Sequence, residues 1–99
     1  MTLLRWTDQA ADDLRAIREF IERDSPRYGR LVSERLFDAT QRLELFPLSG
    51  RIVPELGRED VREIILGEYR IVYRLKGETA LLVTVFRSSR LFPTTLSGL

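Results

Sequence analysis

The spacing of apolar residues changes once along this chain of 99 residues, and that change constrains the fold more than any other feature. Up to residue 46 the apolar residues recur at intervals of three and four, which predicts helices. From residue 61 onward they alternate with polar residues in three short runs, which predicts β-strands. Segment 47–60 has prolines and glycines spaced through it and is predicted to be an ordered loop. Residues 2–6 are predicted to form a short strand ahead of the first helix.

Two helices joined by a tight turn are predicted in the first half. Thr7 is the expected N-cap of the first helix, which we expect to end near Asp24. Ser25 and Pro26 then provide a cap and a first-turn proline for the second helix, and Pro47 ends it. So short a connection makes the two helices antiparallel. The apolar positions at helical spacing are Ala10, Leu14, Ile17, Phe20 and Ile21 in the first helix and Tyr28, Val32, Leu36, Ala39, Leu43 and Phe46 in the second.

The three predicted strands of the second half are joined by short turns, so they form an antiparallel meander. They span Val61–Leu66, Tyr69–Leu75 and Ala80–Arg87. Gly67 and Glu68 read as a two-residue hairpin loop with glycine first, and such a loop pairs Ile65 with Arg70.

The whole chain, residues 1–99, is therefore predicted to be one α+β domain. Its elements are an N-terminal strand, an antiparallel helix hairpin and a three-stranded antiparallel meander, followed by a weakly patterned tail over residues 88–99.

The strand pairing also predicts which side chains share a face of the sheet. The side expected to pack on the helices carries Ile64, Leu66, Tyr69, Ile71 and Tyr73, and the opposite side carries Val61, Glu63, Ile65, Arg70, Val72 and Arg74. We expect the half-polar opposite side to contact solvent or a partner. A four-residue second turn over residues 76–79 places Val85 opposite Arg70 and brings Arg87 onto that same side. The candidate anion- or target-binding residues are Arg51, Arg70, Arg74, Arg87 and Arg90.

Two interpretations of these arginines remain open. In the first, they belong to an ordinary solvated surface on which Glu63 pairs with Arg70 or Arg74. In the second, they line an anion-binding concavity, because guanidinium groups on rigid strands match the geometry of phosphate and carboxylate groups.

The composition limits the chemistry that such a site can perform. The chain has no cysteine and no histidine, so it lacks thiolate metal ligands, the commonest general base and the commonest metal ligand. We therefore expect no metal and no cofactor. Sixteen basic and 15 acidic side chains give a net charge of +1, which implies no strong attraction to nucleic acid. The sequence shows no membrane-length apolar run and no signal-peptide pattern, so a cytoplasmic location without membrane contact is expected.

Four segments, in their order and spacing, resemble the RelE/ParE superfamily of bacterial toxins from type II toxin–antitoxin pairs. They are Trp6–Leu14, Phe46–Arg51, Arg62–Arg74 and Val83–Arg90, so the resemblance covers nearly the whole chain. It implies a growth-inhibiting toxin with a sheet backed by a helix hairpin, and a cognate antitoxin as its partner. A homodimer, or a heterotetramer with the antitoxin, agrees with this interpretation.

The superfamily uses two mechanisms, and the resemblance leaves both open. RelE-like members cut mRNA in the ribosomal A site, whereas ParE-like members inhibit DNA gyrase. For an endonuclease, the resemblance implies that Arg70 and Arg87 hold the scissile phosphate and that Glu55 is the base. Residues 88–99, however, lack the tyrosine or histidine that RelE-like members commonly carry after the last strand. We therefore favour the ParE-like mechanism without catalysis, and a member that has lost its toxicity is the third alternative.

Overall fold

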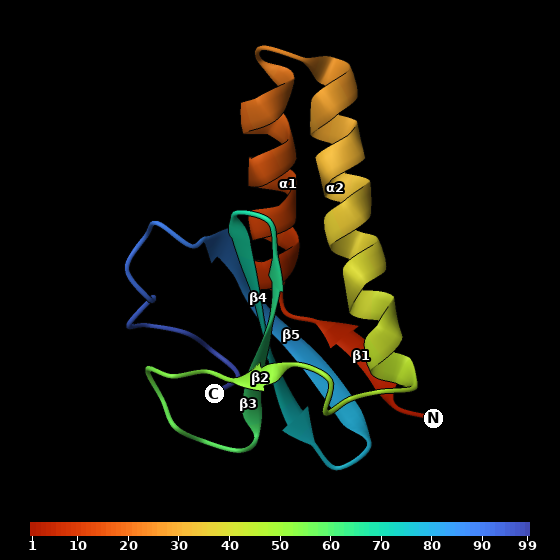
Figure 1. Ribbon diagram of the computed structural model, residues 1–99, viewed down its shortest axis with the longest axis vertical. Helices are drawn as coiled ribbons and strands as arrows, with labels where there is room; N and C mark the ends of the chain where they lie inside the picture. The colour runs from red at the N-terminus through yellow and green to blue at the C-terminus, as the bar shows by residue number, and fades with distance from the viewer.

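Five strands form one sheet, and two antiparallel helices cover one side of it, in the computed structural model of residues 1–99 (Figure 1). The strands are β1 (Leu3–Trp6), β2 (Arg51–Ile52), β3 (Val61–Leu66), β4 (Tyr69–Lys76) and β5 (Thr79–Arg87), in the sheet order β1-β5-β4-β3-β2. The helices are α1 (Asp8–Glu22), α2 (Pro26–Gln41) and the short 3₁₀ helix η1 (Arg42–Glu44). β1 runs parallel to β5, and the other neighbours are antiparallel. No helix has both the length and the apolar character needed to cross a membrane.

Both predicted helix starts are confirmed by their caps. The Thr7 hydroxyl accepts a hydrogen bond from the backbone N–H of Ala10, and the Ser25 hydroxyl accepts one from the N–H of Tyr28. Each bond satisfies one of the amide groups that the first turn of a helix leaves unpaired. The second helix is shorter than predicted, because α2 gives way to η1 after Gln41.

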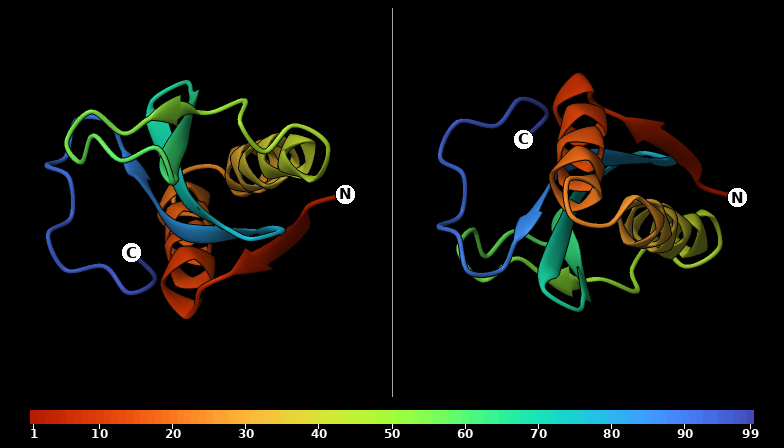
Figure 2. Two further views of the ribbon diagram at one scale, coloured as in Figure 1. Left: turned by 90° about the horizontal axis from the view of Figure 1, so that it is seen from below. Right: turned by 90° about the horizontal axis from the view of Figure 1, so that it is seen from above.

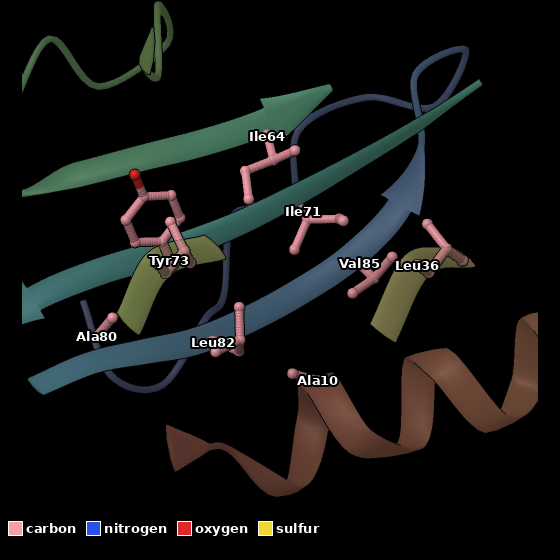
Figure 3. Packing of buried hydrophobic residues seen from close by; sticks show 9 residues of the cluster. Ala10, Leu36, Ile64, Ile71, Tyr73, Ala80, Leu82 and Val85 are labelled. Carbon is pink, nitrogen blue, oxygen red and sulfur yellow. The ribbon is translucent and has the colours of Figure 1, made fainter. Parts of the chain in front are cut away.

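The main core lies between the sheet and the helix hairpin. Figure 3 shows side chains from β3, β4 and β5 pointing toward Ala10 of α1 and Leu36 of α2. The predicted apolar face is confirmed, since Ile64, Ile71 and Tyr73 are buried in this core and Leu66 and Tyr69 pack at its edge.

The first hairpin register is also confirmed. Leu66 pairs with Tyr69, and Ile65 pairs with Arg70. Gly67 has φ = +56°, a backbone conformation that this tight turn requires and that other residues rarely adopt.

The predicted register of the second hairpin holds next to the turn but is wrong in the first half of β4. A bulge between Val72 and Tyr73 adds one residue to β5, so Arg70 pairs with Phe86 instead of Val85. The same shift pairs Arg87 with Tyr69, and paired residues project from the same face of a sheet. Arg87 therefore lies on the helix side, away from Arg70.

The expectation that the other side of the sheet is open is also wrong. A second core forms there from Val53, Val61, Val72, Val83 and Phe86. It is covered by the loop before β3, which includes β2 and Leu56, and by the tail after β5, which contributes Phe92, Leu96 and Leu99. In Figure 2 this tail arcs around the opposite side of the sheet from α2.

The helix hairpin extends past the end of the sheet where β3 turns into β4 (Figure 1). Its distal part therefore has no sheet to cover it. Phe20 is 60% exposed and Tyr28 is 54% exposed, although both occupy positions of the predicted apolar faces. Phe46, which follows η1, is exposed as well.

Candidate functional site

An alternating series of two arginines and two glutamates lies on the side of the sheet opposite the helices. We call it the arginine–glutamate ladder, and it consists of Arg51, Glu63, Arg70 and Glu55. Arg70 projects to this side because its neighbour Ile71 projects into the main core. Glu63 on β3 pairs across the sheet with Arg51 on β2, and the side chains of these two residues form an ion pair.

The loop that carries Arg51 and Glu55 is fixed to the sheet by a tyrosine. The Tyr73 hydroxyl donates a hydrogen bond to the carbonyl oxygen of Pro47 over 2.7 Å and accepts one from the N–H of Gly50 over 3.0 Å. A Cβ atom on Gly50 would lie 2.6 Å from that hydroxyl oxygen, so only glycine fits here. The contact places Arg51 directly beside β3.

The carboxylates use most of the hydrogen-bonding capacity of Arg70. Its Nε donates to Glu63 over 2.6 Å, and its Nη1 and Nη2 donate to the two carboxylate oxygens of Glu55 over 2.8 and 2.7 Å. The other oxygen of Glu63 accepts a hydrogen bond from Arg51 Nε over 2.7 Å. The side chain of Glu63 is fully buried, that of Arg70 is 9% exposed and that of Glu55 is 39% exposed.

Two aromatic rings enclose the Arg70 guanidinium. Its central carbon lies 5.2 Å from the ring centroid of Phe86 and 5.4 Å from that of Phe92. The two rings also contact each other edge to face, with centroids 5.8 Å apart. Arg70 is therefore a link between the sheet and the tail, held by charge on one side and by aromatic rings on the other.

These contacts shift the acid–base behaviour of the pair. The hydrogen bonds from Arg70 lower the pKa of Glu55 from 4.5 to about 2, and those from Glu55 raise the pKa of Arg70 above its ordinary value. A carboxylate with such a low pKa is a weak base at neutral pH. The arrangement therefore suits a structural ion pair better than proton transfer.

Arg74 lies on the same side but belongs to a separate cluster. Arg74 and Arg58 both donate to the carboxylate of Asp60, and the hydrogen bonds from Arg58 lower the pKa of that carboxyl group. Arg58 also donates to the carbonyl oxygen of Leu99 over 3.1 Å. The role of Asp60 could not be predicted from the sequence, because its contacts depend on the path of the loop and the tail.

Arg87 and Arg90 lie at a third place, on the helix side of the sheet. They line a groove of about 300 Å³ between α1 and the end of β5, together with Phe20 and Tyr69. The five candidate arginines are thus divided among three environments. The pairing of Glu63 with Arg70 agrees with the first interpretation, but the two side chains are buried and do not lie on a solvated surface.

Comparisons with known proteins agree with this architecture. The family model described as "ParE toxin of type II toxin-antitoxin system, parDE" matches residues 4–92. A solved structure described as "Chromosomal ParDE TA system from P. aeruginosa" superimposes with a TM-score of 0.74 at 23% sequence identity, covering 88% of this chain and 96% of that one. This likeness shows a shared fold. No curated protein sequence matches the chain. From the family match we conclude that the chain belongs to the ParE toxin family of type II toxin–antitoxin systems.

Proposed function

We propose that this toxin inhibits DNA gyrase by binding it, without cleaving RNA, and that a cognate antitoxin neutralises it. The observation that carries the proposal is the arginine–glutamate ladder. The three donor nitrogens of Arg70 all face carboxylates of the chain itself, so an incoming phosphate has to displace Glu55 first. Membership of the ParE family supports the gyrase target.

The remaining side chains give little support to an endonuclease. Glu55 is the only candidate base beside Arg70 that solvent reaches, and its low pKa makes it a weak one. The hydroxyl of Tyr73 is engaged with Pro47 and Gly50, and burial raises its pKa. Arg87, the second candidate for holding the phosphate, projects from the other face of the sheet.

The antitoxin part of the proposal is supported by the uncovered distal part of the helix hairpin. Grooves of about 300 Å³ and about 270 Å³ lie beneath α1 and α2, and Tyr69 lines both of them. Phe20 borders one groove and Tyr28 borders the other, and both rings are more than half exposed. Exposed apolar surface of this kind is typical of a protein that binds a partner.

The proposal is tested by supercoiling of relaxed plasmid with purified gyrase and increasing amounts of the toxin. We expect supercoiling to fall and cleaved DNA to accumulate, and we expect addition of the antitoxin to restore supercoiling. Unchanged supercoiling at saturating toxin would refute the gyrase target.

A translation extract tests the endonuclease alternative with the same protein. Primer extension on a translated mRNA is expected to reveal no toxin-dependent cuts. Cuts at A-site codons that disappear in Arg70→Ala would instead establish the RelE-like mechanism for this chain.

A further inference from the structure

Three large apolar side chains lie exposed at the end of the molecule that is remote from the connection between α1 and α2. They follow η1 along the chain, and each is more than 60% exposed: Leu45, Phe46 and Leu48. In Figure 1 this segment leads from the lower end of the hairpin toward β2. We call residues 45–49 the apolar turn. Large apolar side chains that are exposed together are typical of an interaction surface.

Hydrogen bonds hold the apolar turn in one conformation. The N–H of Ser49 donates to the carbonyl oxygen of Phe46 over 3.0 Å, which closes a β-turn with Pro47 at its second position. The N–H of Phe46 donates to the carbonyl oxygen of Arg42 over 2.8 Å, and the buried Tyr73 hydroxyl donates to that of Pro47. A segment that is already ordered loses little conformational entropy when a partner covers it.

Two arginines without ion-pair partners lie at the base of the apolar turn. Arg42 is exposed, and its guanidinium forms no hydrogen bond or ion pair within the chain. Arg62 donates to the backbone carbonyl oxygens of Gly50 and Glu59, each over 3.1 Å, and to no carboxylate. The surface thus combines exposed apolar side chains with uncompensated positive charge. Such a surface complements an apolar pocket that is bordered by carboxylates.

The same charges disfavour a second copy of the toxin as the occupant. A two-fold interface places the same patch of both copies face to face, so arginines would approach arginines. The antitoxin already has a proposed surface on the distal part of the hairpin, around Phe20 and Tyr28. The apolar turn is therefore free to contact the target.

We propose that the toxin binds gyrase through the apolar turn. Phe46 and Leu48 insert into an apolar pocket of the enzyme, and Arg42 faces a carboxylate at the edge of that pocket. This inference rests on the proposed gyrase target and assigns the residues that contact it. The surfaces for the target and for the antitoxin then lie at opposite ends of the helix hairpin.

Surface plasmon resonance of the complete toxin over immobilised gyrase holoenzyme, without DNA, tests the inference. Phe46→Ala/Leu48→Ala is expected to weaken binding by about thirtyfold or more, as truncation of central anchor residues does. Because both side chains are exposed, this variant is expected to keep the melting temperature of the wild type. Arg42→Glu is expected to weaken binding by about tenfold at low salt and by less at high salt.

Leu91→Ala and Arg30→Glu are the matched controls for the apolar and the charged variants. Leu91 is almost fully exposed in the tail, and Arg30 is exposed on α2 without an ion-pair partner. Both control variants are expected to bind gyrase with the affinity of the wild type. A loss of binding in the controls as large as in the variants of the apolar turn would contradict the inference.

Cross-linking provides a second measurement that does not depend on weakened binding. The chain has no cysteine, so Leu48→Cys and Leu91→Cys each introduce a single position for labelling with benzophenone maleimide. We expect irradiation to cross-link the labelled Leu48→Cys protein to gyrase and to leave the labelled Leu91→Cys protein free.

The outcomes separate this inference from the proposed target. Wild-type affinity of Phe46→Ala/Leu48→Ala, or cross-links from Leu91→Cys instead of Leu48→Cys, would overturn the inference and leave the gyrase target standing. A wild-type toxin that binds plasmid DNA alone and not gyrase would overturn both.

Discussion

The side chain of Arg70 is almost completely buried, and the side chain of its ion-pair partner Glu63 is fully buried. Removing one member of a buried ion pair leaves the other without compensation, which typically costs about 3–5 kcal/mol. Arg70→Met is therefore expected to lower the free energy of unfolding by about that amount in urea denaturation.

Arg15→Met provides the comparison for this prediction. Arg15 is exposed and pairs only with exposed carboxylates of α1, so its replacement is expected to change stability by less than about 0.5 kcal/mol. If the two variants unfold at the same urea concentration, the ladder does not stabilise the fold.

Glu55 gives the ladder a pH dependence whose direction follows from its pKa. In the folded protein the pKa is lowered from 4.5 to about 2, so the stabilisation is complete above pH 4.5 and is lost as the pH falls toward 2. Because 39% of the side chain is exposed, solvent screening limits the effect, and we expect Glu55→Gln to cost about 1–2 kcal/mol at neutral pH.

Chemical denaturation of the wild type and Glu55→Gln between pH 7 and pH 2 measures this effect. The difference in unfolding free energy is expected to shrink below pH 4.5, the ordinary pKa of this carboxyl group, because Glu55 becomes protonated in the unfolded chain while it stays ionised in the folded chain down to about pH 2. A difference that stays constant across this range would show that Glu55 is not stabilised in its charged form.

At the scale of the elements, the tail from residue 88 onward contributes to the second core although it contains no helix or strand. Phe92 contacts Phe86 and the Arg70 guanidinium, whereas the adjacent Leu91 is 94% exposed. We expect Phe92→Ala to lower stability by about 2–4 kcal/mol and Leu91→Ala to have almost no effect. Thermal unfolding of both variants measures this difference. Equal melting temperatures would mean that packing of the tail on the sheet does not stabilise the fold.

The elements that local signals determine were predictable from the sequence. Thr7 and Ser25 mark the helix starts, and the two-residue loop at Gly67 fixes the register that brings Arg70 beside Glu63. Each of these depends on a few neighbouring residues whose chemistry allows one local conformation.

The parts that depend on contacts distant in sequence were not predictable. The bulge at Val72 moves Arg87 to the other face, and no turn residue marks it. Glu55 reaches Arg70 because the loop folds back over the sheet, and a loop has no periodicity from which its side-chain directions follow. The burial of the second face likewise required the position of the tail.

At the scale of the whole molecule, the two faces of the sheet have different roles. The face with Arg70 is closed by a loop, a tail and internal ion pairs. The other face supports a helix hairpin that extends beyond the sheet and leaves apolar side chains uncovered (Figure 1). We therefore expect partner binding to depend on the hairpin side and the fold to depend on the ladder.

The central claim is that the ladder serves the fold and that the toxin acts on gyrase without it. Its most direct test is the concentration of folded protein that halves gyrase supercoiling, measured for the wild type and for Glu55→Gln. The account predicts inhibition by both proteins at the same concentration. A folded Glu55→Gln protein that no longer inhibits gyrase, or a wild-type protein that never does, would contradict it.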